Sequence, residues 1–474
     1  MLLKYDKVEL SEVCSLSQGL QIPIAKRFRE EGPNRYFYIT VQFLKNDSDR
    51  YFIENPPERV KCTAEDILVV RTGNTGQIIT GVDGCFHNNF FKVEPNNKVY
   101  SKFLYYTLKS PELYTRMRNV ASGTTILDLK HSAFLGLDIY LPDLNNQKKI
   151  AHVLDIIDQK IKICESINKN LQTLSKSLLK YHLEDFEPYL ENGIKSSEIG
   201  DIPKEWVIYE FGSISNIYNG YSYKGNELQP SNSAMVTIKN FNRDGSFRSD
   251  GFKEIIYSDK VKDYHFVNEN DVLISCTDVT QDADIIGNCI ILLDKMNYDN
   301  LIMSMDLVKI ESKRKEINNF LLASILKSYR FKMHILGYVN GTTVLHLDKK
   351  GIKKFKLALP NDLSILKDLN DSLESIYKQI AVNQKQINSL QNLRDTLLPK
   401  LMSGEIDVSK INCYLKIIIR KFILNPLNYL WRYLNENKNY IQNTKSNETL
   451  LKSRAIYKID KFFANFTTRY RYYR

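Results

Sequence analysis

The most constraining feature of this sequence is that its first half repeats in its second half. The segment ASGTTILDLKHSAFLGLDIYLP at 121–142 parallels VNGTTVLHLDKKGIKKFKLALP at 339–360, with a constant offset of 218 between their identical positions. Earlier in each half, AEDILVVRTGN at 64–74 parallels NENDVLISCTD at 268–278. Several matching blocks in the same order indicate duplication of a structural unit. The chain is therefore predicted to contain two homologous halves.

Each half is predicted to be a mixed α/β (α+β) module followed by one long helix. EDILVV and NDVLIS are short apolar runs bounded by Gly, Asn or Asp, which indicates strands. Apolar residues then recur every three or four positions across 145–183 and again across 363–398, which indicates two long helices. We predict that these helices pack on each other as an antiparallel coiled coil with pseudo-two-fold symmetry. The alternative is that each helix packs on its own module.

The apolar stripes define the predicted seam between the two helices. The stripes match between the halves at an offset of 219, one more than in the preceding segment, because the material between matching blocks differs in length. The seam is predicted to contain Leu154, Ile157, Ile161, Leu171, Leu174, Leu178, Leu373, Ile376, Ile380, Leu390, Leu393 and Leu397.

The formal net charge of +11 belongs mostly to the C-terminal tail. Residues 411–474 contain 13 Lys and Arg against three acids, so the rest of the chain is close to neutral. The overall charge therefore says little about a nucleic-acid partner, because basic charge must lie on the binding surface to matter. The tail also ends in TTRYRYYR. Basic residues among aromatic rings could stack on single-stranded nucleic acid; the alternative is a poorly folded extension.

Cysteine spacing and hydropathy restrict the compartment. The seven cysteines are scattered and form no CxxC pair, so a disulfide framework or a zinc site is not expected. No run of about 18 uncharged apolar residues is present, so a membrane span is not expected. The simplest compartment is the cytoplasm.

Candidate catalytic motifs fail on their context. Asn55-Pro56-Pro57 is followed by Glu58, where the base-stacking motif of amino-methyltransferases needs Tyr or Phe. Pro142-Asp143 with Asp158-Gln159-Lys160 matches the loose nuclease pattern, but its second part lies on the predicted helix. We therefore predict that the chain is not an enzyme and binds no metal.

Five segments in combination resemble the specificity (S) subunit of type I restriction–modification systems. They are DILVVRTGNTG, SGTTILDL followed by LP, LPDLNNQKKIAHVLDIIDQKI, SEIGDIPKEW and LLPKLMSGEIDVS. The resemblance covers about 1–409. The second copy departs from it where Cys276 stands in place of Arg71 and His346 in place of Asp128.

The resemblance implies an architecture and a set of partners. Two target recognition domains would each read one half of a bipartite site on double-stranded DNA, and the helices would set the gap. Two modification (methyltransferase) subunits would bind this chain, and restriction subunits would join them. S-adenosylmethionine, ATP and Mg would belong to those partners, and no cofactor to this chain. The implied parts are a first target recognition domain at 1–143, a first spacer helix at 144–183, a linker at 184–200, a second target recognition domain at 201–361, a second spacer helix at 362–402 and an unassigned tail at 403–474.

Base readout and phosphate binding require Arg, Lys, Asn or Gln in accessible loops. The first module offers such residues in IAKRFREEGPNR and RTGNTG, and the second module in IKNFNRDGSFR. The predicted DNA-binding residues are Lys26, Arg27, Arg29, Asn34, Arg35, Arg71 and Asn74 in the first module, and Lys239, Asn240, Asn242, Arg243 and Arg248 in the second. The alternative function is a duplicated coiled-coil scaffold that binds protein and prefers no duplex sequence.

Overall fold

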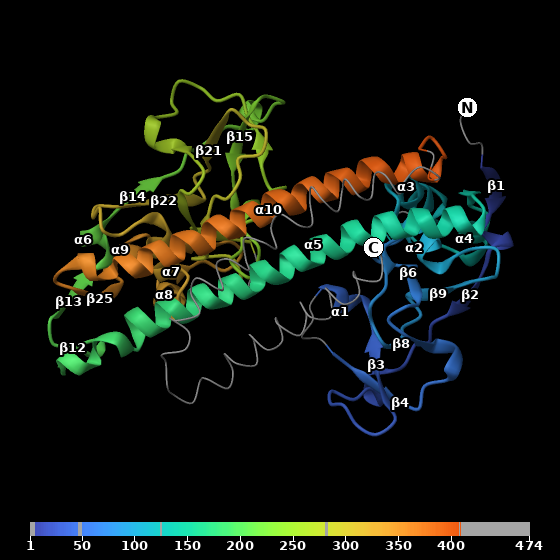
Figure 1. The fold of residues 1–474 in the computed structure, drawn as a ribbon, viewed down its shortest axis with the longest axis horizontal. Helices are drawn as coiled ribbons and strands as arrows, with labels where there is room; N and C mark the ends of the chain where they lie inside the picture. The colour runs from blue at the N-terminus through green and yellow to red at the C-terminus, as the bar shows by residue number, and fades with distance from the viewer. Residues whose placement is uncertain (1–4, 46–49, 124–125, 280–282, 407, 409–474) are drawn as a thin grey trace, which may run out of the picture. The chain divides into compact units, whose positions relative to one another are not determined.

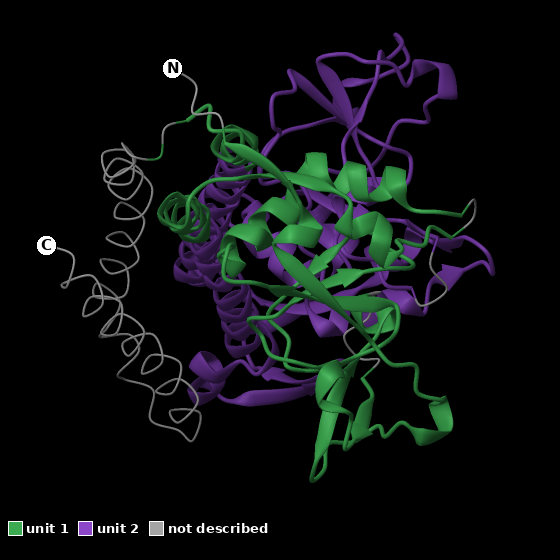
Figure 2. Ribbon diagram, turned by 90° about the vertical axis from the view of Figure 1, so that its right-hand side faces the viewer, with its two compact units in different colours: residues 1–156, 395–474 green, residues 157–394 purple. Residues whose placement is uncertain are grey.

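The computed structural model describes residues 5–45, 50–123, 126–279, 283–406 and 408. It divides into two compact units, one formed by 1–156 with the chain from 395 onward and the other by 157–394 (Figure 2). Nearly all of the basic aromatic tail lies outside the described residues, so the predictions for it are untested. Both long helices contribute residues to both units, and each unit is considered separately below.

Unit 1 contains two four-stranded sheets and a strand pair. The first sheet has the order β2-β9-β6-β7, and all of its pairs are antiparallel. The second has the order β4-β3-β8-β5, in which β3 and β8 run parallel. The strands are β1 (Asp6–Glu9), paired with β10 (Asp138–Leu141), then β2 (Cys14–Gln18), β3 (Arg35–Ile39), β4 (Phe52–Glu54), β5 (Lys61–Cys62), β6 (Ile67–Val70), β7 (Ile78–Ile79), β8 (Gly84–Phe86) and β9 (Phe90–Pro95).

Unit 2 repeats this topology strand for strand. Figure 1 labels several of the strands of each unit. Its sheets have the orders β14-β22-β18-β20 and β16-β15-β21-β17, and β15 and β21 are again the parallel pair. The duplication predicted from sequence is therefore confirmed. The strands are β13 (Trp206–Glu210), paired with β25 (Lys356–Pro360), then β14 (Ser215–Asn219), β15 (Ser233–Val236), β16 (Lys253–Glu254), β17 (Phe266–Val267), β18 (Val272–Ser275), β20 (Cys289–Ile291), β21 (Asn300–Met303) and β22 (Leu307–Ser312).

Smaller elements complete the two units. Unit 2 also has a three-stranded sheet of order β19-β24-β23 and a β11-β12 hairpin in the region between the modules. These strands are β11 (Ile194–Ser197), β12 (Gly200–Pro203), β19 (Thr277–Asp278), β23 (Val339–Asn340) and β24 (Leu345–Leu347). The short helices are α1 (Val41–Lys45), α2 (Ser101–Lys109), α3 (Pro111–Val120), α4 (His131–Leu135), α6 (Phe211–Ile214), α7 (Asn319–Leu326), α8 (Tyr329–Leu336) and α9 (Lys350–Lys354).

The repeated Gly-Thr-Thr segment has a backbone reason to keep its glycine. Gly123 and Gly341 both have φ of +113°, which side-chain-bearing residues rarely adopt. A Cβ atom on Gly123 would lie 2.3 Å from the Ile126 carbonyl oxygen, and one on Gly341 would lie 2.2 Å from that of Val344. Both halves therefore need glycine for the same close turn.

The two long helices are α5 (Leu144–Leu179) and α10 (Lys367–Met402), each of 36 residues. An aspartate one or two residues after each Leu-Pro pair caps the turn that follows it. Asp143 Oδ1 accepts hydrogen bonds from the backbone N–H groups of Asn145 and Asn146, both at 3.0 Å. Asp362 Oδ1 accepts the N–H of Ser364 at 3.0 Å. The predicted spacer and domain boundaries stay predictions, since each compact unit takes in parts of both helices.

Within unit 2, α5 and α10 are joined by polar contacts that run in antiparallel order. Arg394 Nη1 bonds Asp158 Oδ1 at 2.9 Å, and further along Asn383 Nδ2 donates to Asn168 Oδ1 at 2.8 Å. Ser175 and Tyr377 follow, with 3.4 Å between their hydroxyl oxygens. Partner numbers fall along α10 as they rise along α5. In this unit the helices therefore pack on each other, as predicted.

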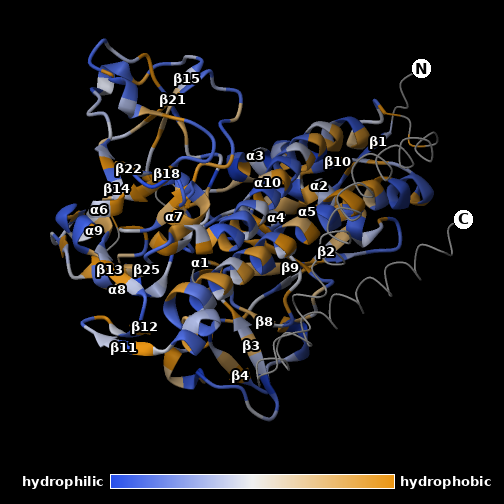
Figure 3. Cartoon of the chain, turned by 60° about the vertical axis from the view of Figure 1, so that its left-hand side comes forward, coloured by the Kyte–Doolittle hydropathy of each residue, from blue (hydrophilic) through white to orange (hydrophobic). Residues whose placement is uncertain are grey.

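The predicted seam is largely but not wholly buried. Among its members, Leu174 is 41% exposed, while the neighbouring Ser175 is 3% exposed. Leu178, Leu393 and Leu397 are half-buried, and the remaining predicted seam residues are buried. Leu174 is thus a correction: a straight helix needs about 3.6 residues per turn, slightly more than the 3.5 of a strict heptad repeat, so the buried face moves along it. Polar and apolar residues alternate along both long helices (Figure 3).

Truncating Leu171 should cost far more stability than truncating Leu174. Leu171 is 8% exposed and belongs to the main apolar core of unit 2. Leu171→Ala is therefore expected to lower the free energy of unfolding by about 2–5 kcal/mol. Leu174→Ala should change it by under about 0.5 kcal/mol, because its side chain lies largely in solvent. Urea unfolding of the two variants checks this; equal losses would contradict the placement of the buried face.

The described residues show no disulfide, no metal-ligand cluster and no membrane-spanning helix. The six described cysteines are free and buried, and burial raises the pKa of Cys276 and of Cys289 to about 12. Among the described residues, no group of His, Cys, Asp and Glu is arranged to hold a metal ion. No helix in the described part is long and apolar enough to cross a membrane.

Candidate nucleic-acid interface

Three of the predicted arginines of the first module, Arg27, Arg29 and Arg35, lie against aromatic rings. The Arg29 guanidinium lies 3.9 Å from the centre of the Tyr51 ring, and that of Arg35 lies 3.6 Å from the Phe28 ring. We call Arg27, Arg29 and Arg35, with Phe28, Tyr38 and Tyr51, the arginine–aromatic cluster. Such stacking fixes a guanidinium group and leaves its edges able to donate.

Two further predicted residues border this cluster. Lys26 ends a short 3-10 helix and its side chain is exposed. Asn34 is exposed and has a left-handed backbone, with φ of +56°. Arg27 is less available, because it donates to the Ile22 carbonyl oxygen through Nε at 2.9 Å and Nη2 at 2.8 Å. Lys26, Arg29 and Asn34 are therefore the accessible members of this set.

Arg71 pairs with a carboxylate, whereas the arginines of the arginine–aromatic cluster stack on rings. Its guanidinium binds Asp128 through two bonds, Nε to Oδ1 at 2.6 Å and Nη2 to Oδ2 at 3.0 Å. Arg71 also lowers the pKa of the Asp128 carboxyl through this hydrogen bonding. Asn74, in the same turn, is exposed and donates to Gln77 Oε1 at 3.3 Å. The guanidinium edge of Arg71 is thus used inside the protein, whereas the Asn74 amide borders solvent.

Asp128 is a residue that the sequence analysis missed as a site residue. The signal was present, because Arg71 and Asp128 are both replaced in the second repeat, by Cys276 and His346. When an ion pair is absent from one copy of a repeat, both of its members can be replaced there, as Arg71 and Asp128 are.

Asn240 in the second module requires a correction. Its side chain is 0% exposed. Asn240 Oδ1 accepts the backbone N–H of Thr237 at 2.9 Å, and its Nδ2 donates to the Arg248 carbonyl oxygen at 3.0 Å. In this conformation Asn240 cannot reach a ligand; it positions the loop that carries the other predicted residues.

The remaining residues of the second set lie on that loop. Lys239 is exposed and is the middle residue of a short 3-10 helix. Asn242 Nδ2 donates to Ser246 Oγ at 2.9 Å. Arg243 Nη1 lies 3.4 Å from Asp284 Oδ2, and Arg248 Nη2 donates to Asp250 Oδ2 at 2.8 Å. Both arginines are mostly exposed, and each has an acidic neighbour that offsets part of its positive charge.

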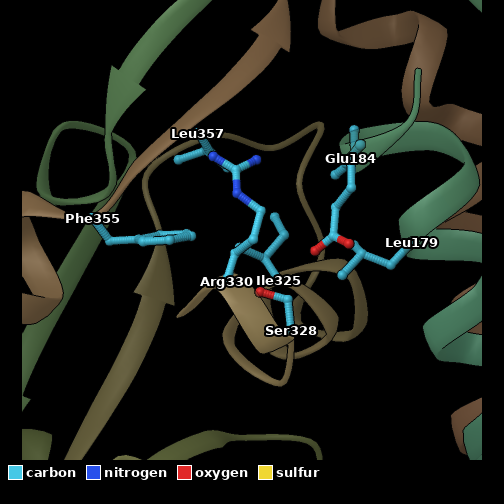
Figure 4. Close-up of a pocket in the computed structure, with 8 residues that line it drawn as sticks. Leu179, Glu184, Ile325, Ser328, Arg330, Phe355 and Leu357 are labelled. Atoms are coloured by element: carbon cyan, nitrogen blue, oxygen red, sulfur yellow. The ribbon is translucent and has the colours of Figure 1, made fainter. Parts of the chain in front are cut away.

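A small pocket at the end of α5 is a poorer candidate for a binding site than the basic loops described above. Its cavity volume is only about 20 Å³, and it is lined mainly by apolar side chains, with Glu184 and Arg330 coming from different elements (Figure 4). Burial raises the pKa of the Glu184 carboxyl, and the charge of Arg330 opposes that shift. Ser328 is occupied as the cap of α8, where its Oγ accepts the N–H of Phe331 at 3.1 Å. The pocket therefore lies where the end of α5 packs against the second module.

Comparisons with known proteins agree with the duplicated architecture. A family model described as the type I restriction modification DNA specificity domain matches residues 3–173 and 203–392. The type I restriction enzyme MjaVIII specificity subunit of Methanocaldococcus jannaschii is 24% identical over 397 residues, which is 81% of this chain and 89% of that protein. The MjaIX specificity subunit of the same organism is 26% identical over 332 residues, or 69% of this chain and 73% of that protein.

A solved structure has a similar fold. The S subunit of a type I restriction–modification system from M. genitalium superposes with a TM-score of 0.52 at 17% sequence identity. The match covers 84% of this chain and 96% of that chain.

Proposed function

This chain belongs to the family of type I restriction–modification DNA specificity domains, and from that premise we propose that it reads a bipartite DNA target with one half-site for each module. The observation that carries the proposal is the duplicated topology, in which two modules with the same strand orders are each followed by a 36-residue helix. Two recognition modules held apart by a rigid element can bind two DNA half-sites that are separated by a fixed distance.

The chain acts as the non-catalytic recognition member of a larger complex with DNA and restriction–modification subunits. We propose that two methyltransferase subunits dock on it, and that restriction subunits complete the nuclease. S-adenosylmethionine, ATP and Mg would be held by those partners. The cytoplasm, where host DNA is accessible in a prokaryotic cell, is the proposed location.

The arginine–aromatic cluster and the loop at 239–248 are proposed as the DNA-facing parts of the two modules. Arg29 is exposed and held by ring stacking, so less side-chain entropy is lost when it meets a phosphate oxygen. Phosphate contacts of this kind position the protein, and base contacts from neighbouring amides such as Asn34 and Asn242 would specify sequence.

Selection from a random duplex library tests this function. The chain, purified with its methyltransferase subunits, is expected to enrich two short conserved blocks separated by an unread segment of constant length. A complex that assembles but enriches no duplex would favour a protein-binding scaffold. Enrichment of one continuous block would contradict the division of labour between the modules.

A further inference from the structure

The turn after strand β6 and the turn after strand β18 are equivalent positions of the two modules. In unit 1 the Gly76 N–H donates to the Val70 carbonyl oxygen at 2.8 Å, and in unit 2 the Gly287 N–H donates to that of Ser275 at 2.8 Å. A leucine that follows the Gly-Thr-Thr segment by four residues joins each turn in the same way. Leu129 N–H donates to the Arg71 carbonyl oxygen at 3.1 Å, and Leu347 N–H to that of Cys276 at 2.9 Å.

The first module holds its turn with an ion pair. Arg71 and Asp128 form the two-bond contact described above, with side chains 33% and 29% exposed. Thr75, which is 0% exposed, adds a hydrogen bond from its Oγ1 to the Leu127 carbonyl oxygen at 2.7 Å. The turn that carries Asn74 is thereby tied to the segment that ends the module.

The second module cannot use that ion pair, since Cys276 and His346 replace its two members. It holds its turn from inside with Asp278, which is 0% exposed. Asp278 Oδ2 accepts the backbone N–H groups of Ile285 at 2.6 Å and of Ile286 at 3.1 Å. The position that aligns with Asp278 in the first module is Gly73, which has no side chain to do this.

Lys332 on α8 holds the same turn from the other side. Its Nζ donates to the Ile286 carbonyl oxygen at 2.6 Å and to Asn288 Oδ1 at 2.8 Å. Burial lowers the pKa of this ammonium group, and the charges of Asp278 and Asp284 oppose the shift. The turn also adjoins the predicted reading loop, because Asp284 pairs with Arg243 at 3.4 Å.

We propose that these are two non-equivalent braces, Arg71–Asp128 in the first module and Asp278 with Lys332 in the second, and that each brace positions the reading surface of its own module alone. The inference rests on the proposed function and adds which residues control each half-site. Removing one member of a partly buried charged contact leaves its partner unpaired, so the turn shifts while the remote module is untouched.

The test compares Asp128→Asn with Lys332→Met in the complex with its methyltransferase subunits. The measured quantity is kcat/KM for methylation of duplexes that carry one substitution at each position of each half-site. Asp128→Asn is expected to reduce discrimination about tenfold in one half, and Lys332→Met to do so in the other half. The two variants thus identify which module reads which half.

Charge-exchange and conservative variants separate positioning from general stability. The double variant Arg71→Asp/Asp128→Arg should restore discrimination that either single change loses, and Asp128→Glu should retain most of it. If Lys332→Met prevents assembly, Asn288→Ala replaces it, because it removes one contact of the same ammonium group.

The outcomes are distinct. Loss of discrimination in opposite halves supports the braces. Loss in the same half, equal loss in both halves, or unchanged discrimination in both variants overturns them. A wild-type complex without a bipartite preference would instead refute the proposed function, so the two failures cannot be confused.

Discussion

Removing residues 161–167 from α5 together with 384–390 from α10 should shorten the unread gap of the target by about three base pairs. Seven residues of helix span about 10 Å at about 1.5 Å per residue, and stacked base pairs are about 3.4 Å apart. Two helical turns are removed, so the buried faces of both helices remain in phase. Both half-site sequences should be unchanged.

The two deleted segments are chosen from the contacts within unit 2. The pairs Asp158–Arg394 and Asn168–Asn383 lie on either side of both deletions, so the shortened helices can form both contacts again. Deleting 161–167 alone is the matched control, because it leaves the matching seven-residue stretch of α10 without its partner and should destabilise the unit. The gap is read from the methylation motif of the assembled complex. An unchanged gap, or a changed half-site, would contradict the role of these helices as spacers.

Reversing the charge of Lys26 and Arg29 together should weaken binding of the complex to its target by roughly 10–100-fold at moderate salt. Both side chains are exposed, and Arg29 presents a guanidinium group that is already held against Tyr51. Reversal replaces attraction to phosphate by repulsion, so the dependence of log affinity on log salt should also become shallower by about two. Fluorescence anisotropy at several salt concentrations measures both quantities.

Lys195→Glu with Lys367→Glu provides the matched control for this change. Both lysines are exposed, and both lie outside the predicted DNA-binding set. This control has the same change in net charge and should leave the salt dependence nearly unaltered. If the two double variants weaken binding equally, the effect comes from overall charge, and the arginine–aromatic cluster is not at the interface.

The duplication could be predicted from sequence because it depends on local signals. Short apolar runs bounded by turn residues became β6 and β18, and the repeated glycine marks a backbone conformation that only glycine adopts easily. The helix seam was predicted less well. Asn168, Asn383 and Ser175 are buried polar residues that bond across the two helices, and a polar residue is normally assigned to solvent.

The candidate site could be predicted only in part, because accessibility is a property of the folded loop. Asn240 is of a residue type that can read bases, yet both polar atoms of its side-chain amide form hydrogen bonds within its own loop. Lys332 holds a turn that lies more than forty residues earlier in the chain, and no local pattern reports such a contact. The pair Arg71 and Asp128 was within reach, since both positions change together in the second repeat.

Long-read methylation sequencing tests the central claim most directly. Genomic DNA would be taken from cells that express this chain with its neighbouring methyltransferase subunit, and from cells that express the methyltransferase subunit alone. The account predicts a new split motif that appears only with this chain, with a modified base in each half and a constant unread gap. An assembled, active complex that modifies a continuous motif, or that modifies DNA without sequence preference, would contradict it.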